Sequence, residues 1–317
     1  MHRVFIDGQA GTTGLQIHER LHARNDIELL EIDPAERKNS DAKRAIINAA
    51  DVVVLCLPDD AAVETVSMAE SDNVRFIDAS TAHRTADGWV YGFPELTEDQ
   101  RSRISSAARV SNPGCYPTGF LATIRPLTET GMMRSNALIT ISAISGYSGG
   151  GRQLIEKYEA RSAVNPDRLW HARPYALKLQ HKHIPEMKHF AALNHAPVFL
   201  PVVGHFHQGM LVSVPVFSEQ LSRRLSPGDV HEMLQARYAS EPCVNVMPLN
   251  TEDALDAGFL DPEHANGTNR IDLFVYGHDE QMVLIARLDN LGKGAAGAAV
   301  QNLNLMLQVS ELEGLTT

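Results

Sequence analysis

Cysteine, long apolar runs and positive charge are all scarce in this sequence of 317 residues. Its three cysteines, Cys56, Cys115 and Cys243, are an odd number without the spacing of a disulfide framework, which indicates free thiols in a reducing, cytoplasmic setting. No apolar run approaches the roughly 18 residues that a membrane span requires. The first residues, MHRVFIDG, already read as a strand, so no signal peptide is expected.

The balance of charge excludes further partners. With a net charge of -11, the chain is not expected to bind nucleic acid or an anionic membrane surface. Small anionic ligands stay compatible with this charge, because a site can be locally basic. Apolar residues make up 44% and charged residues 21% of the chain, as in ordinary globular proteins, and its length predicts two domains.

Over about the first 120 residues, short apolar runs alternate with helical stretches. The apolar runs RVFID, IELLEI, DVVVLCLP and VRFIDAS are separated by GLQIHERLHAR, SDAKRAIINAA and DDAAVETVSMAE. Continuous apolar strands separated by helices are typical of a parallel sheet covered on both faces. The sequence therefore predicts an α/β, Rossmann-type doubly wound sheet in this half.

From about residue 135 the pattern changes. ALITISAI, GMLVSVPVF, RIDLFVYG and QMVLIARL read as strands without regular intervening helices, which predicts a second, α+β domain with a mixed or antiparallel sheet. Residues 150–190 are polar, show no convincing hydrophobic periodicity and are expected to form a long insertion. The stretch KGAAGAAVQNLNLMLQV predicts a closely packed helix near the C-terminus.

A glycine-rich stretch, GQAGTTG, lies between the first strand and the first helix. Gly8, Gly11 and Gly14 would allow a tight turn and bring backbone N–H groups close to a pyrophosphate. The spacing is one residue away from the commoner G-x-G-x-x-G, and the alternative is a plain strand-to-helix loop. Its position after a strand and before a helix favours a dinucleotide site.

The end of the second strand bears on the choice of nicotinamide cofactor. Glu31 or Asp33 lies where a ribose-binding acid would sit in an NAD protein. A basic and polar trio follows immediately and is suited to a 2′-phosphate: Arg37, Lys38 and Ser40. The alternative for this trio is a solvated helix start. The sequence favours NADP over NAD.

The stretch SNPGCYPTG places a cysteine at a turn before a helix. Pro117 suits the first helical turn, so Cys115 is expected at or just before a helix N-terminus. The positive end of the helix dipole stabilises a thiolate and lowers the pKa of such a cysteine, which makes it a nucleophile. The alternative is a small residue filling a tight turn. Cys56 lies in a strand expected to be buried, and Cys243 has no activating pattern.

A thiolate beside a nicotinamide site suggests a particular reaction. An acyl group held as a thioester can accept hydride and then leave as an aldehyde, with a histidine moving the proton. Two histidine pairs stand out, His181 with His183 in QHKHIPEM and His205 with His207 in GHFHQGM. In a strand, each pair would share one face. Zinc binding is the alternative, although neither pair has helical spacing or a C-x-x-C partner.

These motifs resemble the N-acetyl-γ-glutamyl-phosphate reductase family, in its shorter form, nearly end to end. The motifs that carry the resemblance are GQAGTTG, VYGFPEL, SNPGCYPTG, SGYSGGGR, HKHIPEM, HFHQGM and DNLGKGAAGAAVQNLN. Aspartate-semialdehyde dehydrogenases share the layout but look less similar. The resemblance implies NADPH-dependent reduction of N-acetyl-L-glutamyl 5-phosphate to N-acetyl-L-glutamate 5-semialdehyde and phosphate, through a cysteine thioester, in arginine biosynthesis.

The resemblance also implies an organisation and a set of site residues. We expect a dinucleotide-binding domain at 1–116, joined by the C-terminal helix at 291–317, and a catalytic and oligomerisation domain at 117–290. Cys115 matches the nucleophile and His183 the acid/base, with His181 as the fallback. The expected contacts to NADP(H), besides the 2′-phosphate trio, are Gly8, Gly11, Thr12, Thr13, Gly14, Ser145, Gly146, Asn290 and Gly294. The expected contacts to the substrate are Asn112, His181, Arg84 and Arg152.

The sequence also departs from the family at one motif and is compatible with alternative functions. STAHR at 80–84 stands where longer members of the family have SADFR. The motifs do not fix the length of the substrate chain, so another acyl-phosphate reductase, such as aspartate-semialdehyde dehydrogenase, is an alternative. A zinc hydrolase and a nucleotide sensor without activity are alternatives from other classes. A homodimer or homotetramer is expected, with no metal.

Overall fold

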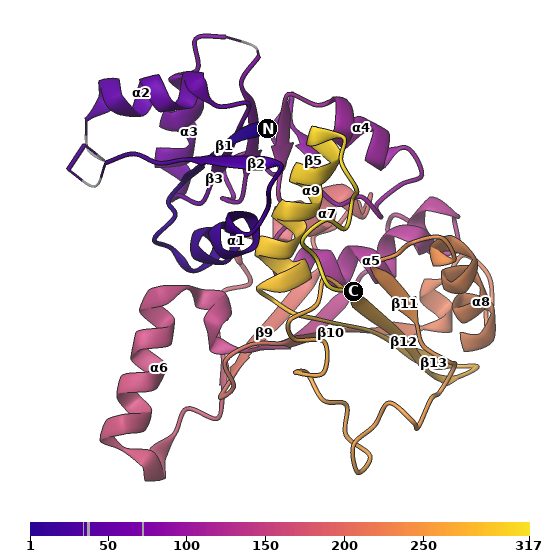
Figure 1. Ribbon diagram of the computed structural model, residues 1–317. Coiled ribbons are helices and arrows are strands. Elements are labelled where there is room, and N and C mark those ends of the chain that lie inside the picture. Colours follow the sequence, from indigo (N-terminus) through magenta and orange to yellow (C-terminus); the bar gives the residue numbers. More distant parts are fainter. Residues whose placement is uncertain (34, 37–38, 72) are drawn as a thin grey trace. The chain divides into compact units, whose positions relative to one another are not determined.

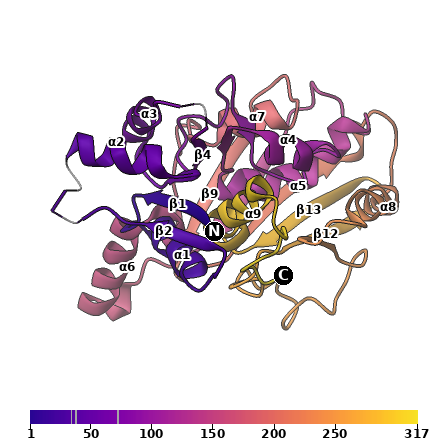
Figure 2. The same cartoon turned by 45° about the horizontal axis from the view of Figure 1, so that its top comes forward.

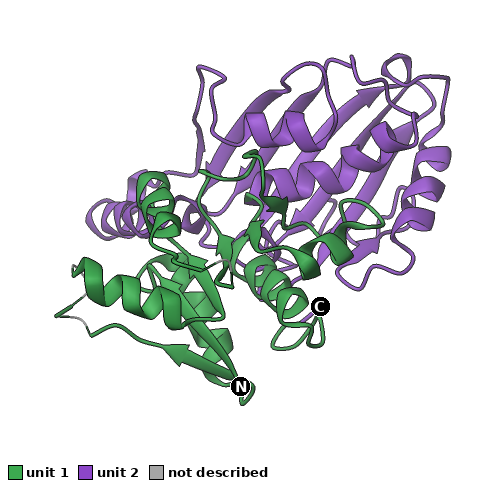
Figure 3. Cartoon of the chain, turned by 90° about the horizontal axis from the view of Figure 1, so that it is seen from above, with its two compact units in different colours: residues 1–114, 295–315 green, residues 115–294, 316–317 purple. Residues whose placement is uncertain are grey.

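The computed structural model (Figures 1 and 2) describes residues 1–33, 35–36, 39–71 and 73–317. The chain divides into two compact units, which Figure 3 shows in separate colours. Unit 1 contains residues 1–114 and 295–315, and unit 2 contains residues 115–294 and 316–317. These units are defined by contacts within the chain. The limits of the functional domains expected from the sequence stay a prediction. Within the described ranges, no helix is long and apolar enough to cross a bilayer.

Unit 1 is built on a six-stranded, wholly parallel sheet in the order β2-β1-β3-β4-β6-β5. This is the predicted Rossmann-type sheet. Its strands are β1 (His2–Asp7), β2 (Ile27–Leu30), β3 (Val52–Leu55), β4 (Arg75–Asp78), β5 (Val90–Tyr91) and β6 (Arg109–Ser111). Its helices are α1 (Thr12–His22), α2 (Ser40–Ala49), α3 (Asp59–Ser67), α4 (Gln100–Ser106) and α9 (Gly297–Leu307).

Successive residues of each central strand face opposite sides of this sheet, and each side has its own core. Val4 and Ile6 of β1 pack with Ile17 of α1 in a cluster that also includes residues of α9. Phe5, between them, packs with Ile47 of α2 in a second cluster. The sheet is therefore covered on both faces, as the unbroken apolar strands predict.

The helix α9 completes unit 1 although it is far away in sequence. It lies beside α1 (Figures 1 and 2), and Leu303 is buried in the core that β1 and α1 share. Its polar side is buried as well, because Gln301 donates to Glu95 at 3.0 Å and Asn302 donates to the Gly92 carbonyl at 2.8 Å. This helix is anchored by hydrogen bonds as much as by apolar packing.

Unit 2 contains a seven-stranded mixed sheet in the order β11-β12-β13-β10-β7-β9-β8, as predicted for the second half. Two of its pairs, β7 with β9 and β11 with β12, are parallel. Its strands are β7 (Thr140–Ser145), β8 (Ala172–Pro174), β9 (Val198–Gly204), β10 (Met210–Phe217), β11 (Val244–Val246), β12 (Ile271–His278) and β13 (Gln281–Leu288). Its helices are α5 (Cys115–Glu129), α6 (Arg152–Val164), α7 (Ile184–Phe190) and α8 (Pro227–Tyr238). The helices α5 and α8 pack against strands of the sheet, and a π-helical turn (Gly292–Ala296) follows β13.

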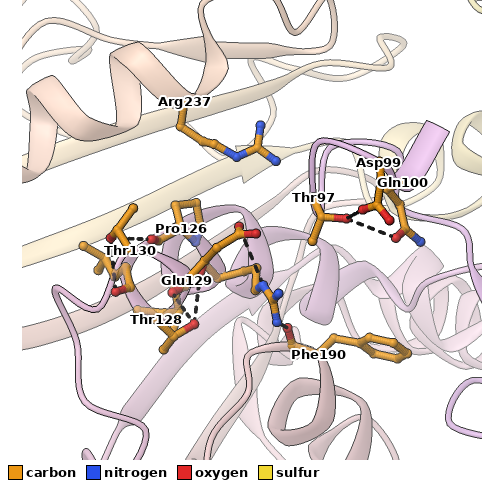
Figure 4. A network of polar contacts seen from close by, with 12 residues as sticks. Thr97, Asp99, Gln100, Pro126, Thr128, Glu129, Thr130, Phe190 and Arg237 are labelled. Atoms are coloured by element: carbon orange, nitrogen blue, oxygen red, sulfur yellow. Dashed lines mark hydrogen bonds and ion pairs between the residues drawn. The ribbon is translucent and has the colours of Figure 1, made fainter. Parts of the chain in front are cut away.

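The long helix α5 contains a proline, Pro126, whose missing N–H leaves the carbonyl of Ala122 without its usual helical partner. The hydroxyl of Tyr238, at the end of α8, donates to this carbonyl at 2.8 Å. One turn later, the Thr130 hydroxyl donates to the Pro126 carbonyl at 2.8 Å (Figure 4). The buried helix thus keeps its backbone satisfied despite the proline.

Residues 150–190, expected as an insertion without periodic structure, contain the helices α6 and α7. Of the residues of α6, all of which the structure describes, Tyr158 alone is buried, so the helix has no apolar stripe that a periodicity search could find. A pair between Arg152 and Glu156, 2.8 Å apart and four residues apart in sequence, supports it locally. Figure 1 shows α6 standing away from β9 and β10.

Candidate active site

The glycine stretch of unit 1 forms a tight loop between β1 and α1. Gly8 has a φ of +92°, and a Cβ there would collide with the carbonyl of Cys56. A Cβ on Gly14 would lie 2.5 Å from the Gly8 oxygen. Only glycine fits these two positions, so the loop chemistry predicted from GQAGTTG is matched by its geometry.

The first turn of α1 suits a pyrophosphate. Its N-cap is Gly11, which offers no side-chain cap, and the turn, fully described, has no acidic residue. The first helical bond runs from Leu15 to the Gly11 carbonyl at 2.8 Å. The N–H groups of Thr12 and Thr13 precede it, at the positive end of the helix dipole. The residues therefore fit a dinucleotide phosphate, and their role as contacts stays a prediction.

The residues proposed for cofactor choice are only partly described. Arg37 and Lys38 lie outside the described residues. Ser40 is the first residue of α2 and is exposed. Glu31 is exposed, 3.7 Å from His18, and Asp33 accepts a hydrogen bond from the backbone of Ala35 at 2.8 Å. Neither acid is held in a buried ribose site.

The cysteine that the sequence singled out is the first residue of α5, as predicted, and Pro117 lies in the first turn. Cys115 is partly buried. The π-helical turn passes directly beside it, because a Cβ on Gly294 would lie 2.8 Å from the Cys115 Cβ. Any side chain at position 294 would therefore press on the thiol-bearing residue.

The histidines His181 and His183 lie in a loop before α7, not in a strand, so the expected sharing of a strand face is wrong. The helix α7 begins at Ile184, directly after His183, and Pro185 lies in its first turn. The pair is still close, with ring centroids 4.7 Å apart. Both rings lie 5.9 Å from the ring of Tyr116, the residue after the cysteine.

The hydrogen bonds of His181 indicate its tautomer. Its Nδ1 accepts from the backbone N–H of His183 at 3.1 Å, so in the neutral ring the proton is on Nε2. Nε2 lies 3.3 Å from the Tyr175 hydroxyl, which in turn lies 3.4 Å from the Tyr116 hydroxyl. Both ring nitrogens of His181 are engaged within unit 2.

The two tyrosines beside the cysteine keep their protons. Burial, more than the nearby Tyr175 and Cys115, raises the pKa of Tyr116 well above its usual value. Burial raises the pKa of Tyr175 to about 12, while the hydrogen bond with Tyr116 lowers it and Cys115 raises it. Sequence reasoning missed both residues: Tyr116 lies inside the cysteine motif, and Tyr175 is marked by no pattern.

A second group of predicted residues lies together where β7 and β13 end. Asn290 accepts from the Gly209 N–H at 2.7 Å and donates to the Ser148 hydroxyl at 3.0 Å. A Cβ on Gly146 would lie 2.5 Å from the His207 carbonyl oxygen, so this turn too requires glycine. Ser145, the last residue of β7, is buried. Their role as cofactor contacts stays a prediction.

The predicted substrate contacts are distributed. In unit 1, buried Arg84 donates to the Asn112 carbonyl at 3.1 Å, and the Asn112 side chain donates to the Ala295 carbonyl at 3.0 Å. Through these hydrogen bonds, both residues hold segments of unit 1 together. In unit 2, Arg152 is largely exposed and pairs with Glu156. All three stay predictions as substrate ligands.

The remaining cysteines are buried or partly buried, and the second histidine pair lies against an aromatic ring. Burial, with the Asp78 and Asp7 carboxylates adding to it, raises the pKa of Cys56 to about 12, and Cys243 is buried. His205 and His207 lie in the loop after β9, against the ring of Tyr147. In the described part of the chain, no three His, Cys, Asp or Glu side chains are grouped as metal ligands.

Comparisons with known proteins agree with this arrangement. Residues 3–104 match the family described as semialdehyde dehydrogenase, NAD binding domain, and residues 115–290 match its dimerisation domain. The chain is 50% identical to N-acetyl-γ-glutamyl-phosphate reductase 2 of a Nostoc species over 320 residues, with 99% of each chain covered. It is 48% identical to the N-acetyl-γ-glutamyl-phosphate reductase of Brucella suis over 309 residues, covering 96% of this chain and 98% of that one.

Solved structures show the same fold. Aspartate-semialdehyde dehydrogenase of Francisella tularensis matches 97% of the chain with a TM-score of 0.74 at 14% identity and is itself covered fully, at 100%. Aspartate-semialdehyde dehydrogenase II of Vibrio cholerae matches with a TM-score of 0.71 at 14% identity, covering 97% and 98% of the two chains. The expected fold, enzyme class and use of NADP(H) are confirmed. The chain belongs to the N-acetyl-γ-glutamyl-phosphate reductases, within the semialdehyde dehydrogenase family.

Proposed function

We propose that this chain reduces N-acetyl-L-glutamyl 5-phosphate to N-acetyl-L-glutamate 5-semialdehyde in arginine biosynthesis, with Cys115 as nucleophile and His183 as acid/base. The names of relatives that are 48–50% identical over nearly the whole chain support the reaction. The observation that carries the residue roles is the position of Cys115 at the first turn of α5, with the two histidine rings next to Tyr116.

The chain's own residues divide the chemistry into three tasks. The Cys115 thiolate, favoured at the positive end of α5, attacks the acyl carbon and phosphate leaves, which gives a thioester. Bound NADPH supplies the hydride that reduces this thioester. His183 donates a proton to the thiohemiacetal oxygen as it forms and takes the same proton back as the carbon–sulfur bond breaks, which releases the aldehyde and the thiolate.

The hydrogen bonds of His181 support the assignment of this role to its neighbour. A general base needs a ring nitrogen that can accept the moving proton. Nδ1 of His181 already accepts from the His183 backbone, and its Nε2 faces Tyr175. His181 is therefore proposed to hold the loop of His183 and to contact the substrate, rather than to move the proton.

The glycine loop and the first turn of α1 are proposed to bind the NADP(H) pyrophosphate, through the backbone at Gly8, Gly11, Thr12, Thr13 and Gly14. The absence of a side-chain cap and of acidic residues in this described turn supports the proposal. Ser145, Gly146, Asn290 and Gly294 are proposed to line the nicotinamide side. Their hydrogen bonds and close approaches to Cys115 and the 146–149 turn support that placement.

A homo-oligomer is expected of a chain whose second unit matches a dimerisation domain. We propose a homodimer, or a homotetramer built from such dimers, that uses the sheet face opposite α5 and α8. Val198, Leu200 and Phe217 are 41%, 44% and 58% exposed on β9 and β10. Leu200→Glu should convert the species measured by sedimentation to monomer, and an unchanged mass would remove this face from the interface.

A cytoplasmic location is also proposed. The three cysteines, none of which forms a disulfide in the described structure, and the use of NADPH in a biosynthetic reduction support it. Fractionation of cells, with the protein detected by an antibody, would test this location.

The reaction is tested by phosphate-dependent reduction of NADP with N-acetylglutamate semialdehyde, with aspartate semialdehyde assayed in parallel. Cys115→Ser should abolish turnover and leave NADPH binding, measured by fluorescence, largely intact. Cys243→Ala is the matched control, because Cys243 is a buried thiol of the same unit. Retention of most activity by Cys115→Ser would disprove the covalent mechanism, and faster turnover of aspartate semialdehyde would change the substrate.

A further inference from the structure

Unit 1 contains a cavity of about 200 Å³ next to the glycine loop. It is lined by residues 5–10 and by three side chains from separate segments: Ile32, Lys43 and Leu57. The volume holds part of a dinucleotide and not the whole. In a Rossmann sheet the ribose next to the pyrophosphate lies at the ends of the first two strands, which is where this cavity opens.

The acids that would select NAD do not line this cavity. Glu31 is 69% exposed in its side chain and faces His18, and Asp33 closes a turn with Ala35. The residue that the end of β2 contributes instead is the apolar Ile32. A 2′-hydroxyl would find no carboxylate from β2 in this place.

The cavity does contain a cation. The Lys43 ammonium of α2 lies 2.7 Å from an Asp7 carboxylate oxygen and 2.8 Å from the Thr65 hydroxyl, and its side chain is 19% exposed. Thr65 is fully buried and itself donates to the Ala61 carbonyl at 2.9 Å. The ammonium is therefore held in one place by two partners on rigid elements, at the end of β1 and on α3.

The next residue along α2 gives a useful contrast. Arg44 is directed to Glu70, 3.9 Å away, and its side chain is 45% exposed. It does not line the cavity. Of these two adjacent cations on the same helix, only Lys43 lies where a bound nucleotide would meet it.

We propose that the Lys43 ammonium pairs with the 2′-phosphate of NADP(H) and so selects this cofactor over NAD(H). An ammonium has three N–H donors, and among the described residues Asp7 and Thr65 accept from two of them. The third serves an acceptor that enters the cavity, and a phosphate is the acceptor that a lysine point charge suits. The inference rests on the proposed function only in taking NADP(H) as the cofactor.

The test uses two adenosine phosphates as probes, 2′,5′-ADP and 5′-AMP, titrated calorimetrically into the full-length protein. Lys43→Met should weaken 2′,5′-ADP about 10- to 100-fold, as expected for a lost charge-assisted bond, and 5′-AMP by less than about threefold. Lys43→Arg, which keeps the charge, should retain most of the preference for 2′,5′-ADP. Arg44→Met should change neither probe.

An equal loss of both probes in Lys43→Met would overturn the proposal, because Lys43 would then only support the loop through Asp7. Unchanged binding of 2′,5′-ADP would also overturn it. If Lys43→Met does not fold because Asp7 loses its partner, the double variant Asp7→Asn with Lys43→Met removes the unpaired charge, and the same ratio of the two probes decides. Neither probe needs Cys115 or a semialdehyde, so failure of the reductase assay with a normal 2′,5′-ADP preference would reject the proposed function alone.

Discussion

At the scale of single residues, the surroundings of Cys115 depend on which neighbouring side chains keep a proton and can donate a hydrogen bond. Tyr116 and Tyr175 stay protonated because burial raises their pKa values, so they present hydroxyl groups beside Cys115 without adding negative charge. His181 is tied to the backbone of His183, which fixes where that loop begins. The candidate site therefore combines two groups proposed to react, Cys115 and His183, with neighbours that are proposed to hold them in position.

The division of work between the two histidines can be measured. His183→Asn should lower the rate of semialdehyde oxidation by about 10²–10⁴-fold, the usual contribution of a general acid or base, with little change in NADPH binding. His181→Asn should raise KM more than it lowers kcat, because it is proposed to hold the loop and contact the substrate. If the two effects are reversed, His181 moves the proton.

The buried Cys56 thiol should make the stability of the protein depend on pH. In an unfolded chain a thiol ionises near pH 8.5, whereas in the folded protein burial raises the pKa of Cys56 to about 12. Between these values the folded state keeps a proton that the unfolded state loses, so the contribution of Cys56 to stability is present below about pH 8.5 and is lost as pH rises toward 12. Urea titrations at pH 8 and pH 10.5 should show a smaller decline in Cys56→Ala than in the wild type, and equal declines would contradict the prediction.

Part of this site was predictable from sequence and part was not. Cys115 was found because a proline two residues later marks a helix start, which is local information. Tyr175 near the cysteine and Lys43 next to the glycine loop were not found, because their contacts are with residues far away in the chain, Tyr116 and Asp7. Single residues of that kind carry no spacing pattern, and only the fold shows what they touch.

At the scale of elements, α5 begins at Cys115 and is itself held at its interior proline. The Ala122 carbonyl, which Pro126 leaves without a helical partner, accepts from Tyr238 of α8. A buried carbonyl without a partner costs about 1–3 kcal/mol. One hydroxyl therefore links the helix of the active site to the helix beside it.

Tyr238→Phe should lower the free energy of unfolding by about 1–3 kcal/mol, because the Ala122 carbonyl would be buried without a donor. The same substitution made in a Pro126→Ala background should cost less, since the restored N–H of residue 126 can serve that carbonyl. Urea unfolding of the four proteins gives the coupling energy of this cycle. A coupling near zero would show that Tyr238 contributes by packing alone.

Elements were predictable where burial produces a regular apolar pattern in the sequence. The unbroken apolar runs of β1 and β3 predicted buried parallel strands because both faces of that sheet are covered. The helix α6 was missed because Tyr158 is its one buried residue, and the histidine pair was placed in a strand because alternation alone does not reveal that Pro185 starts a helix. Sequence patterns report burial, and these elements have little of it or are governed by a single proline.

At the scale of the whole molecule, unit 1 is assembled from two distant segments. Its core includes Val300 and Leu303 of α9, and the buried amides of this helix bind Glu95 and the Gly92 carbonyl. Removal of α9 would expose the apolar residues of β1 and α1 that it covers and leave Glu95 without one of its donors. The integrity of the dinucleotide-binding unit therefore depends on the last part of the chain.

A chain that ends at Gly294 should lose the cooperative unfolding of unit 1. Hydrogen exchange measured by mass spectrometry should show loss of protection in peptides of β1, β3 and β4, because their shared core is open to water. Leu307→Ala in the full-length chain is a milder control, since Leu307 is only partly buried against that core. Full protection of β1 in the shortened chain would show that α9 is dispensable.

The position of α9 in the sequence also determines when unit 1 can be completed during synthesis on the ribosome. Residues 1–114 are synthesised well before α9, so the core that β1 and α1 share with α9 is not complete until residues 297–307 have left the exit tunnel. Translation of the roughly 180 residues between them takes roughly 10–40 s at bacterial and eukaryotic speeds. Unit 1 is therefore completed only after the intervening residues of unit 2 have been made, and for that interval the part of its core that α9 covers stays exposed to solvent.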